Sequence, residues 1–296
     1  MSLERIKTLA PYLKTEIKGQ EMAIERVCDV MSIGEMGFTD SHKPKGSFLF
    51  IGPTGVGKSQ LAKLVARHLY DDEHFYRFNM SEFKNPEALR DFIGDETGNP
   101  GRLGKILQSA SHGILFFDEM EKAHRDVLMS WLQILDEAQI TCGGKVYHLS
   151  QFYIITTSNI GGRDIMESQH LDEQSIYEHV MDKLREELPP EFGNRFQGNI
   201  IVFNSLKTEV QFEIARDIID REVAKIRAKG FQIEVRGSDV YEFIVKSGID
   251  EKNGARPLES TAQFHIRRAV ARSVLAGGRG HGVLKATFTE ISVEPA

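Results

Sequence analysis

The residues with the clearest chemical potential form one glycine-rich octapeptide. Residues 52–59 read GPTGVGKS and fit the spacing G-x-x-x-x-G-K-[ST] between an apolar run, residues 48–51, and a helical pattern. In such a loop, glycines let backbone N–H groups curl around phosphate oxygens, and the helix start adds its positive dipole end. Lys58 is expected to reach the β- and γ-phosphates of a nucleotide, and Ser59 to bind Mg²⁺. The predicted phosphate-binding residues are Gly52, Pro53, Thr54, Gly55, Val56, Gly57, Lys58 and Ser59.

Two acids end a second apolar run. Residues 114–117 are Ile-Leu-Phe-Phe, and Asp118 and Glu119 follow directly. A buried parallel strand delivers its carboxyl end to the edge of the sheet where ligands bind. There Asp118 can hold hydrated Mg²⁺, and Glu119 can polarise an attacking water. The pair favours ATP hydrolysis, because phosphoryl transfer needs both a metal ligand and a group that positions water.

Three further polar residues have two possible roles each. Asn159, at the end of the run TTSN, could sit between the γ-phosphate and water, but spacing alone favours a helix N-cap or Asx turn. Arg195 and Arg256 lie in the segments PPEFGNRF and GARPL. Each could stabilise charge on a transferring phosphoryl group, although a plain surface arginine is the commoner case.

The elements that must position these residues alternate in type. Short apolar runs suited to buried strands occur with helical patterns between several of them, which predicts a doubly wound α/β sheet. Residues 140–149 carry Gly143-Gly144 between two β-prone arms and predict a hairpin before the fourth strand. The predicted strands are residues 48–51, 75–80, 114–117, 152–157 and 200–203, and one predicted helix covers residues 121–137.

The order of predicted strands and helices changes after residue 204. A long helical pattern covers residues 210–226, and residues 231–235 alternate as a strand with one solvated face. Helices are predicted over residues 238–247 and 257–275, and a final strand over residues 284–293. We therefore expect a large nucleotide-binding domain over residues 1–204 and a small α+β lid domain over residues 205–296.

Composition narrows the class of protein. The 296 residues are 41% hydrophobic and 27% charged, which supports a packed core and excludes general disorder. A net charge of −6 argues against a nucleic-acid coat. Cys28 and Cys142 fit no CxxC or zinc pattern, which indicates reduced cysteines. No apolar run can span a bilayer, and residues 1–9 lack a signal-peptide core, so a cytoplasmic location is expected.

Seven segments together carry a family resemblance. In order along the chain they are GQ (Gly19-Gln20), GPTGVGKS, MSEF (residues 80–83), FFDEMEKAH (residues 116–124), TTSNIG, PPEFGNRF and GARPL. Their order and spacing resemble the Clp-type AAA+ ATPases, and in particular the module that forms the second ATPase ring of those proteins. The resemblance extends from about Glu4 to about Val293.

The resemblance implies a ring-forming, hexameric ATPase that takes ATP and Mg²⁺. Its fold is a five-stranded parallel sheet flanked by helices, with a small α+β lid. Ile17 and Lys18 are then expected beside the adenine, and Asn159 resembles the sensor-1 polar residue. Arg195 resembles the arginine finger that reaches a neighbouring subunit, and Arg256 resembles the sensor-2 arginine of the lid.

Two departures from the family pattern bear on its partners. Clp-type unfoldases grip polypeptide with an aromatic pore loop, whereas residues 93–104 read IGDETGNPGRLG without an aromatic. Asp95, Glu96 and Arg102 suggest either a polar contact with a partner or a solvated turn. Residues 161–180 lack the Ile/Leu/Val-Gly-Phe/Leu tripeptide that docks a barrel peptidase, so no such partner is expected.

The residues favour an ATP-hydrolysing ring motor that remodels a macromolecular partner, with protein favoured over nucleic acid. Two alternatives stay open. An ATP-controlled oligomeric scaffold or switch could recruit cargo outside the pore, which the missing aromatic favours. A DNA-linked regulator is suggested only by the basic stripe of Arg268 and Arg272. Whether the chain is a single-ring protein or a fragment also stays open.

Overall fold

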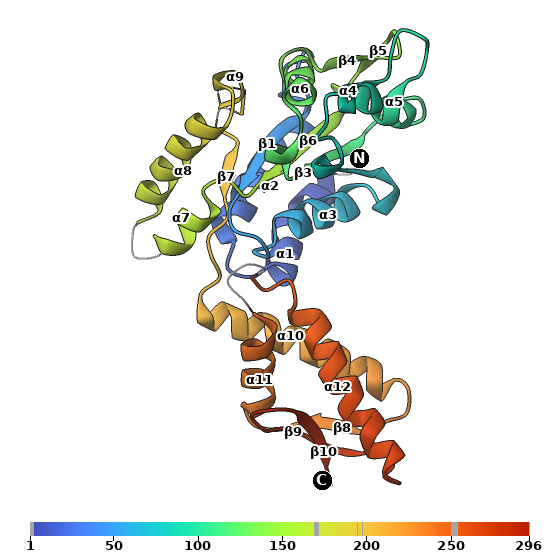
Figure 1. Cartoon of the computed structure of the whole chain (residues 1–296), viewed down its shortest axis with the longest axis vertical. Helices are drawn as coiled ribbons and strands as arrows, with labels where there is room; N and C mark the ends of the chain where they lie inside the picture. Colours follow the sequence, from blue (N-terminus) through green and yellow to red (C-terminus); the bar gives the residue numbers. More distant parts are fainter. Residues whose placement is uncertain (1–2, 169–171, 194, 197, 250–253, 296) are drawn as a thin grey trace. The chain divides into compact units, whose positions relative to one another are not determined.

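The computed structural model describes residues 3–168, 172–193, 195–196, 198–249 and 254–295 (Figure 1). The chain divides into two compact units: one holds residues 1–53 and 57–205, and the other holds residues 206–296 with residues 54–56 grouped to it. The predicted domains, residues 1–204 and 205–296, stay a prediction.

A five-stranded parallel sheet forms the centre of the first unit. Its order is β2-β3-β6-β1-β7, so the chain does not place its strands in sequence order. The strands are β1 (Gly46–Ile51), β2 (Phe75–Asn79), β3 (Gly113–Asp118), β6 (Phe152–Ser158) and β7 (Ile200–Val202). This confirms the predicted parallel sheet. Every residue of β6 is buried, which fits a strand covered on both faces.

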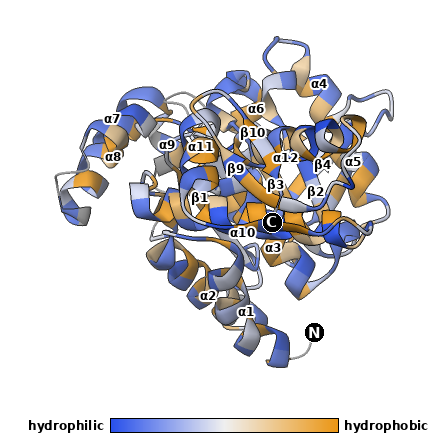
Figure 2. Cartoon of the chain, turned by 90° about the horizontal axis from the view of Figure 1, so that it is seen from below, coloured by the Kyte–Doolittle hydropathy of each residue, from blue (hydrophilic) through white to orange (hydrophobic). Residues whose placement is uncertain are grey.

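Helices cover both faces of this sheet. On one face, α3 (Lys58–Leu69) contacts β2, β3 and β6, and α2 (Glu21–Glu35) contacts β1 and β7. On the other face, Phe117 of β3 packs against Trp131 of α6 (Arg125–Glu137), with ring centroids 4.4 Å apart. Figure 2 shows hydrophobic and hydrophilic residues on the same helices, as expected where one side meets the sheet.

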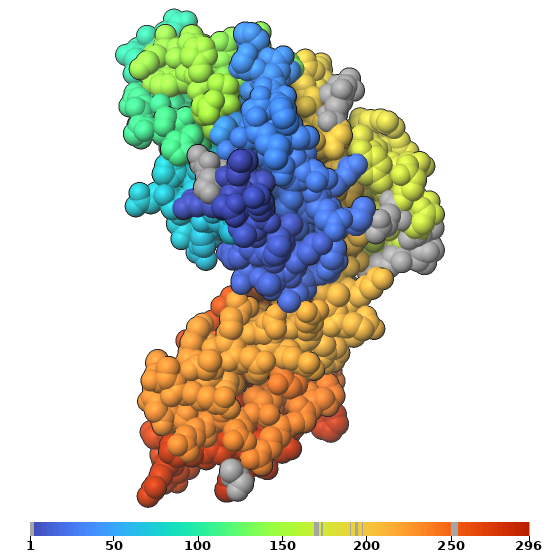
Figure 3. Space-filling model, turned by 180° about the vertical axis from the view of Figure 1, so that it is seen from behind, coloured from blue at the N-terminus to red at the C-terminus, as the bar shows by residue number. Residues whose placement is uncertain are grey.

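Further helices and a hairpin complete the first unit. The N-terminal helix α1 (Leu3–Glu16) packs on α2 and α3, and this segment (dark blue) lies on the surface in Figure 3. Residues 140–149 form the predicted hairpin from β4 (Gln139–Cys142) and β5 (Lys145–His148). The others are η1 (Asp72–His74), η2 (Met80–Glu82), α4 (Ala88–Ile93), α5 (Gly101–Leu107), η3 (Met120–Lys122), α7 (Gly162–Glu167), α8 (Glu173–Glu187) and α9 (Pro190–Gly193).

The second unit has its own sheet and core. Helices α10 (Thr208–Arg227), α11 (Asp239–Gly248) and α12 (Leu258–Leu275) enclose buried side chains such as Ile219, Ile244 and Ile266. Its sheet has the order β10-β9-β8, with β8 (Ile233–Val235) parallel to β9 (Gly282–Ala286). This is the expected small α+β fold.

Two sequence predictions were wrong in detail. Residues 284–293 are not one strand, because β9 turns back into the antiparallel β10 (Ile291–Glu294). The apolar alternation shifts by one position between Phe288 and Ile291, at the turn where Thr287 N donates to Glu290 O. The helix predicted from residue 121 begins at Arg125, because His124 provides its N-cap after one 3₁₀ turn.

Candidate active site

The phosphate loop joins the end of β1 to the start of α3. A Cβ at Gly52 would lie 2.4 Å from the carbonyl oxygen of Phe203, so only glycine fits there. Gly57 has φ +109° and precedes Lys58, the first residue of α3. As at every helix start, the first N–H groups of α3 have no intrahelical partners, which is the arrangement that binds phosphate.

Lys58 is buried and turned back onto its own loop. Its Nζ donates to the carbonyl oxygens of Gly52 (2.5 Å) and Pro53 (2.7 Å), and to Oδ1 of Asn159 (3.0 Å). Burial lowers its pKa to about 8, although the nearby carboxylates, led by Glu121, act in the opposite direction. An anionic group entering the loop would therefore meet a lysine whose charge the protein only partly compensates.

Asp118 ends β3 among hydroxyl groups. Its Oδ1 accepts a hydrogen bond from Thr157 Oγ1 (2.6 Å) and lies 3.3 Å from Ser59 Oγ, while its Oδ2 pairs with Arg77 (2.6 Å). Ser59 and Asp118 present hard oxygen donors, which fit Mg²⁺. Among the described residues, no group of three or more His, Cys, Asp or Glu side chains could hold a metal. A metal ion here would therefore need water or phosphate oxygens to complete its coordination.

Glu119 has an unusual backbone conformation. Its φ is +58° and its ψ is +56°, a left-handed conformation that costs energy in a non-glycine residue. The backbone N–H of Glu119 donates to Thr157 Oγ1 (3.0 Å). Its carboxylate accepts from Lys122 Nζ (2.7 Å) and from Asn159 Nδ2 (3.4 Å). The turn therefore places this carboxylate against the end of β6.

Asn159 joins these groups. Helix α7 begins at Gly162 with Gly161 as its N-cap, so Asn159 does not cap it and that alternative is wrong. Its side chain contacts Lys58 and Glu119 instead. The structure thus connects the side chains of five predicted site residues through direct contacts or through Thr157. They are Lys58, Ser59, Asp118, Glu119 and Asn159.

Sequence reasoning missed three residues of this network. They are Arg77 and Thr157, which both contact Asp118, and Glu121, which contacts Asn159. Arg77 lies on β2, which pairs with β3, so only strand order reveals its proximity. Thr157 and Glu121 were within the quoted motifs TTSNIG and FFDEMEKAH, but nothing in their spacing marked them.

Four other predicted site residues have surroundings of their own. Arg195 is paired with Asp136 of α6, with Nε 2.8 Å from Oδ2, and donates to Glu191 O. Ile17 is buried, and its Cδ1 lies 3.7 Å from where a Cβ of Gly57 would be. Lys18 is half-buried, and Arg256 is exposed in the second unit. Their roles stay predictions, and Asn194 of the same motif lies outside the described residues.

The segment between α4 and α5 is held together by its own contacts. Asp95 pairs with Arg90 (2.5 Å) and accepts a hydrogen bond from the backbone of Thr97 (2.9 Å). Arg102 lies in α5, pairs with Glu82 and lies over the ring of Phe83. Asp95 and Arg102 are therefore engaged within the chain, whereas Glu96 is exposed. Both interpretations of these residues, a polar contact with a partner and a solvated turn, stay predictions.

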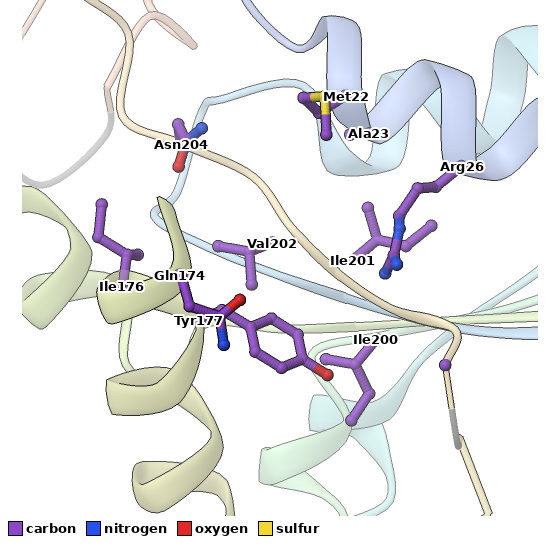
Figure 4. A pocket seen from close by; sticks show the side chains of 11 residues that line it. Met22, Ala23, Arg26, Gln174, Ile176, Tyr177, Ile200, Ile201, Val202 and Asn204 are labelled. Carbon is purple, nitrogen blue, oxygen red and sulfur yellow. The ribbon is translucent and has the colours of Figure 1, made fainter. Parts of the chain in front are cut away.

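A separate hollow of about 320 Å³ lies between α2, α8 and β7. In Figure 4, side chains from all three elements surround it, including Arg26 of α2 and Tyr177 of α8. None of the predicted site residues lines it.

No helix in the described part of the chain is long and apolar enough to cross a membrane.

A glycine-rich loop between a buried parallel strand and a helix, with an acidic strand end beside it, defines a P-loop nucleotide-binding protein. Comparison with protein families matches residues 43–199 to the AAA domain (Cdc48 subfamily). Residues 206–283 match the C-terminal, D2-small domain of ClpB protein. The chain belongs to the AAA+ ATPases, and within them it is of the Clp type.

Individual relatives of this chain support the same family assignment. The chain is 35% identical over 282 residues to the chaperone protein ClpB of Prochlorococcus marinus, covering 92% of this chain and 32% of that protein. It is 33% identical over 282 residues to heat shock protein 100 of Trypanosoma brucei brucei, with the same two coverages. The chain thus spans about a third of the length of these curated relatives.

A solved structure confirms the fold. A closed-state cryoEM reconstruction of Hsp104 with ATPγS and FITC casein matches with a TM-score of 0.86 and 30% sequence identity. The match covers 99% of this chain and 52% of that chain. The D2-small match confirms the expected resemblance to the second ATPase module of Clp-type proteins.

Proposed function

We propose that this chain hydrolyses ATP and uses the cycle to remodel a protein partner. The observation that carries the proposal is the network around Asn159, which joins a phosphate-loop lysine to the acid predicted to activate water. The relatives named above are chaperones, which supports protein remodelling over the scaffold and DNA-linked alternatives.

Each residue has a role in this proposal. The amides of residues 52–59 and Lys58 bind the phosphates, and Ser59 and Asp118 hold Mg²⁺, which would neutralise charge on the β- and γ-oxygens. Glu119 accepts a proton from the attacking water while Asn159 orients that water. The remaining roles follow the family resemblance: Ile17 and Lys18 border the adenine, Arg256 acts on its own subunit's nucleotide, and Arg195 acts on a neighbour's.

The last of these roles requires assembly. We propose a ring of identical chains, hexameric by resemblance to the family, without a barrel peptidase. Arg195 supports this idea because its described contacts are with Asp136 and Glu191 rather than with the phosphate loop of its own chain. Release of Asp136 would free the guanidinium for a phosphate of the next subunit.

Two substitutions test hydrolysis. Lys58→Ala should weaken nucleotide binding by about tenfold or more, because a charge-assisted contact to phosphate is lost. Glu119→Gln should retain binding and lose turnover, because only the charge that activates water is removed. Binding of a fluorescent nucleotide and release of phosphate measure the two effects.

Lys63→Ala is the matched control, because Lys63 lies on the same helix but is exposed. It should change neither quantity. Turnover at a wild-type rate by the Glu119→Gln variant would contradict the role of Glu119. Failure of the wild-type chain to hydrolyse ATP under conditions of ring assembly would contradict the proposed function itself.

A further inference from the structure

Glu121 is an acid of the site to which the proposed mechanism gives no task. It lies in η3, two residues beyond Glu119, and is half-buried. Its Oε1 accepts from both the backbone N (3.3 Å) and the side-chain Nδ2 (3.4 Å) of Asn159. One carboxylate oxygen therefore holds Asn159 at two points, across 38 positions of the chain.

The other carboxylate oxygen of Glu121 makes no hydrogen bond within the described part of the chain that would explain its burial. Oε2 is buried and has no hydrogen-bond partner among the described residues. An unsatisfied buried carboxylate oxygen costs stability, so a purely structural position would favour a neutral or apolar side chain here. A functional role therefore explains a charged side chain at this position better than packing does.

The neighbours of Asn159 determine which way its amide points. Lys58 Nζ can only donate, so it must face Oδ1, and the two carboxylates can only accept, so they must face Nδ2. Without Glu121, Asn159 would lose its backbone anchor and one of the two acceptors that face Nδ2. The amide could then rotate away from the gap between Lys58 and Glu119.

We propose that Glu121 is a positioning residue for ATP hydrolysis, which acts by holding the amide of Asn159 in the orientation that the reaction requires. This inference rests on the proposed function, because it assigns Glu121 a task within that same site. Glu121 touches Asn159 rather than the reacting atoms, so its effect on kcat must pass through Asn159, whereas its charge near Lys58 acts on nucleotide binding. That requirement separates positioning from a general contribution to folding.

A double-mutant cycle provides the test. Steady-state hydrolysis is measured for the wild-type chain, Glu121→Ala, Asn159→Ala and the double variant. Each single substitution should lower kcat by about tenfold and change KM by less than about threefold, as expected when an orienting contact is lost. The double variant should be no slower than Asn159→Ala, because the two residues act as one unit.

Two further variants serve as a conservative substitution and as a control. Glu121→Gln retains an acceptor for Asn159, so its kcat should exceed that of Glu121→Ala. Glu73→Gln removes an exposed acid in η1, outside the site, and should leave kcat unchanged. Thermal unfolding of every variant shows whether a loss of activity follows a loss of folded protein.

Three outcomes would overturn the inference. They are a wild-type kcat in Glu121→Ala, a raised KM with kcat unchanged, and a double variant whose loss equals the product of the single losses. Its failure is distinguishable from failure of the proposed function. If only the inference fails, the wild-type chain still hydrolyses ATP and Glu119→Gln still does not. If the proposed function fails, the wild-type chain itself has no turnover.

Discussion

Arg77 Nη2 lies 2.6 Å from Oδ2 of Asp118, so the carboxylate predicted to hold the metal already has a cationic partner. The two side chains come from the paired strands β2 and β3. Arg77 is 54% exposed and Asp118 only 13%, so the arginine is the partner that can move away. A metal ion that enters beside Ser59 must therefore compete with Arg77 for the negative charge of Asp118.

Removal of this competitor should tighten metal binding. Arg77→Ala is expected to lower the Mg²⁺ dissociation constant of the nucleotide-bound chain about two- to fivefold, since a partly exposed ion pair contributes at most about 1 kcal/mol. Calorimetric titration with MgCl₂ measures the change. Arg67→Ala breaks an exposed pair between Arg67 of α3 and Asp72 of η1 and serves as the control. Unchanged or weaker Mg²⁺ binding in Arg77→Ala would show that Arg77 does not oppose the metal.

Arg195 should act between subunits. Arg195→Ala and Lys58→Ala chains should each be inactive alone, and mixing them should restore part of the ATPase activity. Some interfaces of a mixed ring would then join an intact arginine to an intact phosphate loop. Arg185→Ala removes an exposed arginine of α8 and should remain active without mixing. Mixed rings that form, as seen by subunit exchange, but hydrolyse no ATP would argue against a trans role.

The segment between α4 and α5 should not support general unfolding of proteins. Its closing contacts, Arg90 with Asp95 and Asp95 N with Asn99 O (3.0 Å), leave Glu96 as an exposed charge. Polar contacts of this kind are directional and compete with water, so they hold a generic chain poorly. A stable, unrelated tagged reporter should therefore keep its native fluorescence with this chain and ATP.

A substitution within this segment tests whether it acts independently of the nucleotide site. Asn99→Tyr should leave basal ATP hydrolysis unchanged, because Asn99 contacts no residue of the phosphate loop among its described hydrogen bonds. Robust unfolding of the reporter by the wild-type chain, but not by Glu119→Gln, would add general unfolding of proteins to the proposed function.

The second unit should lose stability in acid because of one ion pair. Arg267 binds both carboxylate oxygens of Glu222 (2.6 and 3.2 Å), and these hydrogen bonds lower the pKa of Glu222 below 4.5. A lowered folded-state pKa means that the stabilisation is present above pH 4.5 and is lost as the pH falls below it.

Glu222→Gln should therefore destabilise the second unit by about 1–2 kcal/mol at neutral pH and weaken its acid sensitivity. Hydrogen exchange of α10 and α12 amides across the pH range measures both effects. Glu234→Gln, which alters an exposed pair with Arg236, should leave the acid sensitivity as it is. An equal loss of protection in acid for wild type and Glu222→Gln would assign the effect to other groups.

The sequence predicted those parts of the site that depend on local order. The phosphate loop needs glycines, a lysine and a hydroxyl within eight consecutive positions, and Asp118 and Glu119 follow their strand directly. The hairpin of β4 and β5 was equally local, because its turn lies between its two arms. Short-range geometry fixes such features, so residue types and spacing were sufficient.

Tertiary structure decided which distant residues meet. The order of the sheet places β3 between β2 and β6, so Arg77, Asp118 and Thr157 converge from three strands. The same convergence brings Glu121 to Asn159. A single sequence does not state strand order or register, because these follow from packing both faces of the sheet at once. The sequence alone thus determined the chemistry available to this protein, and the fold determined which groups hold that chemistry in place.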